Sequence, residues 1–577
     1  MELKDLFTKN LKTRQRQYEA VRAVAFEEGS IEEVALRFGY SPQSLRNLVN
    51  RVRKGKHELF PEVKPGPKGR RVPEEAAELI VELRRKKGLS SYEIVEELKE
   101  QGISIGVRTV ERTLSDAGLP RLRRRSFAER GISKKGILLP DRSASLDMQK
   151  LEPFRADCQV AGVFFFLPYI IESGILEVVQ RCALPESSEI GSRQAALSML
   201  LLKLVGKERL SHIRQYDMDR GFGLFAGLNV LPKPTYICTY SCRTEASVLL
   251  EFQKQIIAGL QGLCPEFYQG ETINLDFHSI PHFGDEPSME RVWCGARGKS
   301  MKGANTFFAQ DGESDALLYS RDDLKRSESS EEIKRFVDYW LDLKGVVDQT
   351  LVFDSKLTRY DVLYELDKAG VKFITLRRRN KKLIEDALKI PEREWDKVHL
   401  PIPKRKYKNV RVHESEVALI EGEREFRQLI VKDHGRAEPT FVISNNQEIK
   451  RAAILKVYAK RWHIENKLAE LVKFFNLNAL SSPIMTRIHF DLLWTVIADS
   501  LYHLFARDLP RFEKAGAPLI FNRFVDMPGQ VHYDGEGINI RIRKRAATPI
   551  LMGVKKLKTD ITVPWLDNLP LRVIWTP

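Results

Sequence analysis

The stretch that decides the fold is TINLDFHSI, residues 272–280, in which apolar and polar residues alternate. A period of two is typical of a β-strand with one buried face. The apolar side chains at positions 273, 275 and 277 would face the core, so Asp276 and His278 share the opposite face. Asp276 is therefore a candidate functional residue on a strand.

A second strand is predicted in QTLVFDSKL, residues 349–357. Its apolar run 351–353 reads as a buried parallel strand, with Asp354 at the carboxyl end. The helix pattern of residues 358–370 and the strand pattern of 371–379 follow it. Functional groups of open α/β sheets gather at the carboxyl ends of the strands, so Asp354 is a second candidate.

The segments around these strands fit an α/β layout. We expect a hairpin from residues 304–312 and 315–322, followed by an amphipathic helix at 329–345. Short alternating stretches predict an inserted antiparallel β unit over residues 386–438, after which the core resumes. Residues 157–263 have a helical pattern without a catalytic candidate.

One long helix is predicted for EIKRAAILKVYAKRWHIENKLAELVKFFNL, residues 448–477. Tyr458, Arg461 and Glu465 fall on one face of it, at about 100° per residue. Taken alone, such a stripe is better explained by a surface helix on which Glu465 pairs with a neighbouring Lys or Arg.

The N-terminal residues carry the signals of three short helices. Ser30 with Glu33 forms a predicted capping box, Gly39 ends that helix, and Ser41 caps a third helix running to Gly55. This pattern is typical of a helix-turn-helix motif, whose last helix lies in the major groove of DNA; a protein-binding three-helix bundle is the alternative. The candidate base-contacting residues are Gln43, Ser44, Arg46 and Asn47.

A basic linker and a second helical unit follow. The linker includes Lys68, Arg70 and Arg71 and can lie extended in a minor groove, although a solvated linker explains it equally well. The second unit has its own capping box, Ser90 with Glu93. Its candidate DNA contacts are Arg108, Thr109 and Arg112.

Composition narrows the functional class. The 577 residues predict about three to five domains, and the net charge of +16 favours a polyanionic partner such as nucleic acid. Six cysteines are too few for a disulfide framework, and MELKDLFTKN has no signal-peptide core, so we expect a cytoplasmic protein. The apolar run 160–171 is too short to span a bilayer, so we expect no membrane partner. The fragment GKS (298–300) lacks the preceding glycine of a phosphate-binding loop, so we expect no ATP site.

Asp276, Asp354 and Glu465 together resemble the Asp-Asp-Glu triad of the ribonuclease-H-like (DDE) transposases. The spacing of Tyr458, Arg461 and Glu465 resembles the Tyr-Arg-Glu-Lys signature of cut-and-paste insertion-sequence transposases, in which a β insertion also precedes the Glu. The resemblance covers roughly residues 150–510, and the paired helix-turn-helix units fit it. One departure is that the family lysine would fall at position 472, where this chain has Val472 followed by Lys473.

The resemblance implies a DNA transposase that binds the ends of its mobile element and catalyses metal-dependent strand cleavage and transfer. Asp276, Asp354 and Glu465 would hold two Mg²⁺ ions, with Mn²⁺ as a substitute, while Tyr458, Arg461 and Lys473 would contact DNA phosphates. Double-stranded DNA is the expected partner and a homodimer the expected synaptic form. The alternative is a DNA-binding regulator derived from a transposase that no longer cuts.

The fold class expected is multidomain α/β: a ribonuclease-H-like catalytic core with an inserted antiparallel β unit, preceded by all-α helix-turn-helix domains. The expected divisions are a first helix-turn-helix domain at 1–60, a linker at 61–72, a second helix-turn-helix domain at 73–125, a basic connector and helical domain at 126–265, the catalytic domain at 266–385 and 439–510, its β insertion at 386–438, and a basic C-terminal region at 511–577.

Overall fold

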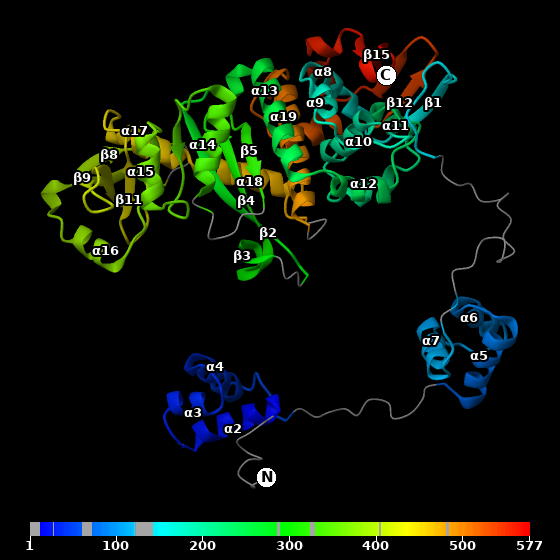
Figure 1. Cartoon of the computed structure of the whole chain (residues 1–577), viewed down its shortest axis with the longest axis horizontal. Helices are drawn as coiled ribbons and strands as arrows, with labels where there is room; N and C mark the ends of the chain where they lie inside the picture. Colours follow the sequence, from blue (N-terminus) through cyan, green and yellow to red (C-terminus); the bar gives the residue numbers. More distant parts are fainter. Residues whose placement is uncertain are drawn as a thin grey trace. The chain divides into compact units, whose positions relative to one another are not determined.

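The computed structural model of the chain describes residues 12–26, 28–60, 72–120, 122, 142–284, 289–322, 329, 331–402, 406–479 and 484–577. The chain divides into two compact units, Met1–Ile137 and Leu138–Pro577. The predicted linker cations Lys68, Arg70 and Arg71 lie outside the described residues. Figure 1 shows the elements of both units.

In the described residues of the N-terminal unit, the first three helices are α2 (Thr13–Ala25), α3 (Ile31–Arg37) and α4 (Pro42–Arg53). The predicted capping box of α3 is confirmed, because Ser30 and Glu33 each accept a hydrogen bond from the other's backbone N–H. Ser41 caps α4, as predicted. α2 begins at Thr13, because TRQR at its start contains no helix breaker.

The second group of helices in this unit is α5 (Glu74–Lys87), α6 (Ser91–Glu100) and α7 (Val107–Asp116). The capping box of Ser90 and Glu93 is present here too. Each group buries its own apolar cluster, around Leu45 in the first and Ile80 in the second. These two small cores explain why short helices with few internal hydrogen bonds are held in place.

A mixed sheet forms the centre of the second unit. Its strand order is β3-β4-β2-β6-β7-β11-β10-β9-β8, with β5 paired to β4. The pairs β2–β4 and β4–β5 are antiparallel, whereas β2–β6 and β6–β7 are parallel. This mixture confirms the α/β prediction and fits a ribonuclease-H-like core. The strands are β2 (Thr272–Pro281), β3 (Glu290–Cys294), β4 (Lys299–Asp311), β5 (Leu317–Arg321), β6 (Thr350–Val352), β7 (Phe373–Leu376), β8 (Asp396–His399), β9 (Asn409–Val417), β10 (Phe426–Lys432) and β11 (Thr440–Ser444).

The segment expected as a β insertion continues this sheet. β8, β9 and β10 pair antiparallel with one another, and β10 pairs with β11, which in turn pairs with β7. The helix α16 (Lys381–Leu388) precedes these strands. The sheet thus extends without a break from the strand of Asp276 to β8.

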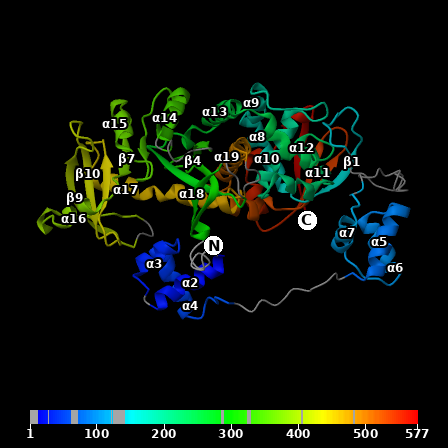
Figure 2. The same cartoon turned by 60° about the horizontal axis from the view of Figure 1, so that its bottom comes forward.

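Helices cover both faces of the sheet. In Figure 2, α14 (Glu331–Lys344) and α15 (Tyr360–Lys368) lie on one side, and α17 (Arg451–Lys460) and α18 (Trp462–Lys473) run along the other. α17 packs against β7 and α18 against β2. The helix predicted as continuous is therefore two helices that meet at Arg461.

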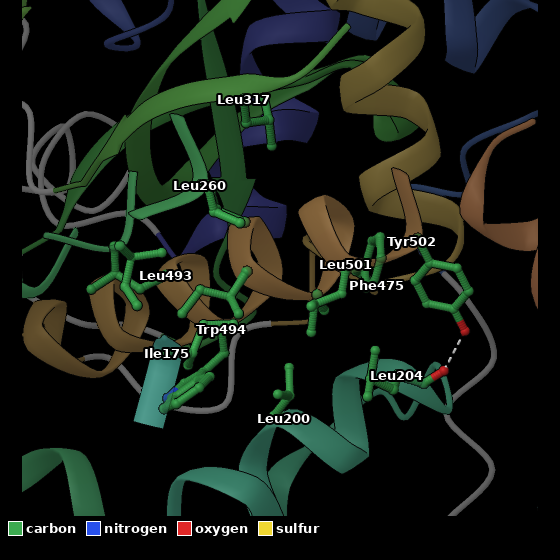
Figure 3. Packing of buried hydrophobic residues seen from close by; sticks show 14 of the residues in the cluster. Ile175, Leu200, Leu204, Leu260, Leu317, Phe475, Leu493, Trp494, Leu501 and Tyr502 are labelled. Atoms are coloured by element: carbon green, nitrogen blue, oxygen red, sulfur yellow. Dashed lines mark hydrogen bonds between the residues drawn. The ribbon is translucent and has the colours of Figure 1, made fainter. Parts of the chain in front are cut away.

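The helix α19 (Met485–Arg507) is buried on nearly all sides. It packs against β5 and against the helices α10 (Ser192–Leu204) and α13 (Ala246–Leu263), as the side chains around Leu493, Trp494 and Leu501 show in Figure 3. The Tyr502 hydroxyl donates a 2.5 Å hydrogen bond to the Leu204 carbonyl. The remaining helices of this body are α8 (Leu167–Glu172), α9 (Ile175–Arg181), α11 (Arg220–Ala226), α12 (Pro234–Tyr240), α20 (Ala517–Ile520) and α21 (Thr548–Leu551).

A second sheet joins the C-terminal residues to the start of this unit. Its order is β1-β12-β13-β15-β14, with bounds Phe154–Cys158, Gly529–Tyr533, Ile538–Arg543, Leu569–Thr576 and Ile561–Val563 in that order. The alternation in INIRIRKR, residues 538–545, predicts an edge strand. That prediction is wrong, because β13 is an inner strand of this sheet. β13 has neighbours on both sides, because β15 pairs with it in parallel. The residues from 154 onward and the basic C-terminal region consequently share one sheet.

All six cysteines are free thiols. No single helix in the described ranges is long and apolar enough to cross a membrane; only the bent pair Ala161–Glu172 and Ile175–Arg181 passes that test of length and composition. Most of this pair's side chains are buried in the hydrophobic core.

The free energy of unfolding should decrease in acid because of His489 on α19. Its buried ring lies 3.6 Å from Asp322, and burial followed by the charge of Arg321 lowers the pKa of His489 to about 4. The unfolded chain, with a pKa of about 6.5, binds more protons between these values, so the free energy of unfolding falls as pH drops from about 7 to about 4, by up to about 3 kcal/mol.

Urea unfolding of the full chain at about pH 7 and about pH 5 checks this expectation against His489→Gln, which removes the ionisable ring. His503, whose pKa burial also lowers, is present in both proteins, so their difference isolates His489. The same pH dependence in wild type and variant would refute the assignment.

Candidate active site

The three predicted carboxylates come from three elements that meet at the centre of the sheet. Asp276 lies in the middle of β2, and Asp354 follows the last residue of β6 by two positions. β2 and β6 pair in parallel as far as Asn274 opposite Val352, and Asp276 and Asp354 each lie two residues beyond that last pair. The charge of Asp354 acts on Asp276, so the two carboxylates are neighbours in the site.

Arg461 joins the third carboxylate to this pair. Its guanidinium donates one hydrogen bond of 3.1 Å to Asp276 and a second to Glu465. The side chains of Arg461 and Asp276 are each only 15% exposed, whereas Glu465 is 55% exposed. A single buried cation thus links the sheet to α18.

The chain turns more tightly where α17 meets α18. The Arg461 N–H donates to the Tyr458 carbonyl and the Ile464 N–H donates to the Arg461 carbonyl, each at 3.1 Å, so three-residue steps replace the four-residue steps of an α-helix. No glycine or proline marks this position in the sequence. The break between the two helices lies at Arg461, the residue whose side chain is hydrogen-bonded to Asp276 of the sheet.

The electrostatics of this cluster reflect burial and crowding of like charge. Burial raises the pKa of Asp276 to about 6; Arg461 opposes the rise, and Asp354 and Glu465 add to it. Burial also raises the pKa of Tyr458 to about 12. Burial alone would lower the pKa of Arg461, but Tyr458 and the three carboxylates raise it, so its charge persists.

The turn that carries Asp354 is held by hydrogen bonds on both sides. The carboxylate accepts a 2.8 Å bond from the Lys356 N–H, and the Asp354 carbonyl accepts from the Thr358 hydroxyl at 3.3 Å. The hydroxyls of Thr358 and buried Thr375 on β7 lie 2.8 Å apart. These contacts fix the Asp354 loop to the end of β7.

A pocket of about 470 Å³ opens beside Asp354, Tyr458 and Arg461. The apolar part of its lining includes side chains of β7, β10, β11 and α17. Its polar lining includes cations that the sequence reading did not single out: Arg377, Arg379 and Arg436. The run RRR at 377–379 directly follows β7, so the carboxyl-end rule that identified Asp354 could have found two of them.

Lys473 is exposed at the last residue of α18, and Val472 is half-buried against the core. Within the described residues, Lys473 forms no hydrogen bond or ion pair with any of the three carboxylates. The buried lysine of this helix is Lys467, whose Nζ lies 2.9 Å from both Asp499 and His503 on α19. The inner face of α18 is thus locked to α19 by a buried ion pair.

The predicted base-contacting residues of α4 are exposed. Arg46 is ion-paired with Glu32, and the Gln43 amide donates to Asn47 at 3.3 Å. The Ser44 hydroxyl accepts a 2.8 Å bond from Ser41. On α7, Arg108 and Arg112 are exposed and Thr109 is half-buried.

Carboxylate oxygens are the hard ligands that Mg²⁺ and Mn²⁺ prefer, and the cluster around Asp276 has three carboxylates for one cation. The donor chemistry of the cluster therefore fits a divalent ion. In the part of the chain that the structure describes, however, no three acidic, histidine or cysteine side chains are arranged to hold one. The Arg461 guanidinium supplies the positive charge between Asp276 and Glu465.

Residues 273–498 match the family described as "Transposase DDE domain". This segment is less than half of the chain, contains all three carboxylates and is similar to a DDE transposase domain. No curated protein matches the chain.

Three solved structures are distantly similar. A cryo-EM structure of the piggyBac transposase synaptic complex with hairpin DNA is 11% identical, with 64% of this chain and 82% of that chain covered and a TM-score of 0.37. A pre-cleavage Mos1 transpososome is 9% identical, covering 63% and 78%, with a TM-score of 0.14. The mariner Mos1 paired end complex with Mg is 9% identical, covering 62% and 76%, with a TM-score of 0.12.

Arg461→Gln should destabilise the chain because it leaves Asp276 buried without its cation. We expect the free energy of unfolding to fall by about 1–3 kcal/mol near pH 8. Removing Arg461 raises the pKa of Asp276 further above about 6. When the folded-state pKa of a carboxyl is raised, the free energy of unfolding of the protein falls as pH rises through that pKa. The loss of stability in the variant relative to wild type should therefore grow between about pH 6 and about pH 8.

Urea unfolding at the two pH values measures this deficit. The matched control is Lys460→Gln, which removes an exposed cation from the adjacent position. Equal stability of the two variants would show that the Arg461 bridge carries no energy.

Proposed function

We propose that this protein is a DNA transposase that binds the ends of its mobile element and cuts and rejoins DNA strands in a metal-dependent, cut-and-paste reaction. One observation carries the proposal. Asp276, Asp354 and Glu465 gather around Arg461, inside the segment that matches the transposase DDE domain.

The proposed chemistry needs hard oxygen ligands. Asp276, Asp354 and Glu465 would hold Mg²⁺ or Mn²⁺, two ions in all, and the ions would supply Lewis-acid stabilisation of an in-line displacement at phosphorus. Burial disfavours the isolated charge of Asp276, which favours its pairing with a cation. The proposed strand cleavage and transfer need no nucleotide cofactor, so ATP has no part in the proposal.

Arg461 and Tyr458 would hold the phosphate beside the cut. Both line the pocket next to Asp354, and the planar guanidinium can bind two phosphate oxygens at once. For Arg461 to do so, its bonds to Asp276 and Glu465 must be exchanged for bonds to DNA. Lys473, exposed at the end of α18, would contact a phosphate further from the centre.

The N-terminal helical groups would read the element ends as helix-turn-helix units. α4 presents Gln43, Ser44, Arg46 and Asn47 at its exposed start, the part of a recognition helix that reaches base edges. Arg46 would exchange Glu32 for a base. Lys68, Arg70 and Arg71 of the linker and Arg108, Thr109 and Arg112 of α7 complete the proposed contacts. The protein would act as a homodimer on two ends, in the cytoplasm.

A DNA-binding regulator derived from a transposase is the second candidate. The valine at position 472, where the family has lysine, favours it, as does the engagement of two carboxylates by Arg461. The two candidates differ in whether DNA is cut.

A cleavage assay separates them. Purified protein is incubated with end-labelled DNA that flanks its own gene, with Mg²⁺ or with EDTA. We expect a cut at one discrete site that disappears in EDTA and in Asp354→Asn and Glu465→Gln, because each variant removes a negative ligand without changing side-chain volume. Tight binding without cleavage under any divalent ion would instead support the regulator, and cleavage unaffected by both substitutions would exclude this site.

DNA binding by α7 has its own test. Arg108→Gln with Arg112→Gln should reduce the dependence of log K on log salt concentration by about 1.8, since each lost phosphate contact removes about 0.9. Lys86→Gln is the control, because Lys86 lies in the same helical group but is ion-paired with Glu82. If the control and the double variant show equal slopes in a fluorescence-anisotropy titration, α7 does not contact DNA.

A further inference from the structure

A two-stranded arm extends from the catalytic sheet. It consists of β3 and the first residues of β4, 290–302, and Figure 1 shows it leaving the body of the unit. Beyond Gly303, β4 pairs with β2, the strand that carries Asp276. The arm is therefore a continuation of the catalytic sheet, and the site described above does not use it.

One face of the arm combines two cations with an exposed indole. The register places Arg291 opposite Lys302 and Trp293 opposite Ser300, and the alternation along β3 puts all four on the same face. Arg291 donates to the Ser300 carbonyl at 3.0 Å and Lys302 to the Met289 carbonyl at 2.7 Å, so backbone oxygens rather than carboxylates hold these cations. Like charges directly opposite each other on paired strands repel and destabilise the pair. An anionic partner would relieve this repulsion.

The exposed ring of Trp293 is a second unfavourable feature of this face. Its side chain is 60% exposed, although a large apolar ring is normally covered. Near the base of the arm, Phe283 is 66% exposed, with the Arg297 guanidinium 4.8 Å from its ring centre. Cations interleaved with exposed aromatic rings are the combination that binds a phosphate backbone and the adjacent bases.

The charge of the described part of the arm is strongly one-sided. Between positions 289 and 302 the sequence has one acid, Glu290, and it lies on the opposite face from Arg291 and Trp293. The acids at 285 and 286 lie outside the described residues. The cations of this stretch are Arg291, Arg297, Lys299 and Lys302.

The base of the arm is packed tightly against the catalytic strand. A Cβ at Gly303 would lie 2.4 Å from the Ile280 carbonyl oxygen and 2.5 Å from a Val292 methyl group, so only glycine fits there. This packing fixes the distance from the arm to the site. Phe308 lies opposite Asp276 and Ser300 opposite Trp293, eight residues apart along β4. At about 3.4 Å per residue, that is at most about 27 Å.

We propose that this arm is a DNA-binding ribbon of the catalytic unit, with Arg291 and Lys302 on phosphates and Trp293 against the bases or sugars of one groove. A two-stranded ribbon fits the major groove of B-DNA. At about 3.4 Å per base pair, the contact lies within about eight base pairs of the cut phosphate. The inference rests on the proposed function. A protein partner is disfavoured because two facing cations would have to be desolvated against it.

Photocrosslinking tests the position of the contact. The full chain is bound to duplexes from the DNA flanking its gene, each with one 5-iododeoxyuridine at a successive position from the mapped cut, and irradiated. We expect crosslinking within about eight base pairs of the cut, abolished by Trp293→Ala and retained in Lys299→Gln. Lys299 is the matched control because it is exposed on the opposite face of the same arm.

Salt-dependent binding tests the cations without requiring cleavage. Arg291→Gln with Lys302→Gln should lower the slope of log K against log salt by about 1.8, whereas Lys299→Gln should leave it unchanged. Both glutamines can still donate to the backbone carbonyls, and unchanged urea midpoints confirm that the variants fold.

The outcomes are distinguishable. If wild type binds and cuts DNA but the arm variants retain its slope and its crosslinks, the arm proposal is overturned and the proposed function stands. If wild type neither binds nor cuts, both fail. If the arm variants change only the monomer–dimer equilibrium, with the salt slope unaffected, the arm contacts a second copy of the chain and the DNA assignment is wrong.

Discussion

The guanidinium of Arg461 lies between a carboxylate of the sheet and a carboxylate of a helix, and the candidate site depends on this contact. Asp276 is largely buried, and a buried charge is tolerated only when it is paired. That requirement holds α18 against β2 and accompanies the tightened turn between α17 and α18. The bridge positions Glu465, which the strands alone could not place. It also places one group able to bind phosphate among three carboxylates, whose charge it offsets only in part.

The position of α18 depends in turn on α19. This helix is surrounded by the core, yet it carries Asp491 and Asp499, which pair at 2.8 and 2.9 Å with Lys203 of α10 and Lys467 of α18. Removing one partner of such a pair would leave an unpaired buried charge, at a cost of about 3–5 kcal/mol. The helical body before the sheet and the helix of Glu465 are therefore attached to one element. The whole of Leu138–Pro577 consequently forms one compact unit rather than a chain of separate domains.

A single sheet sets the distances between the surfaces that surround the site. The strands β2 and β6 place two carboxylates, β7, β10 and β11 form the floor of the adjacent pocket, and β4 continues into the arm. Because the strands are hydrogen-bonded in register, these surfaces cannot shift independently. The close packing at Gly303 makes the base of the arm equally rigid.

Much of the local structure could be read from the sequence alone, because capping and alternation depend on residues a few positions apart. The capping boxes at Ser30 and Ser90, the strand of Asp276 and the strand that precedes Asp354 were all predicted in this way. Contacts between distant segments could not be, since strand pairing and ion pairing depend on which surfaces the fold brings together. The parallel pairing of β13 with β15, the burial of Lys467 against Asp499 and the bridge from Arg461 to Asp276 were decided only by the tertiary structure. The sequence by itself determined which residue types were available, and burial in the tertiary structure determined which charged side chains had to form ion pairs.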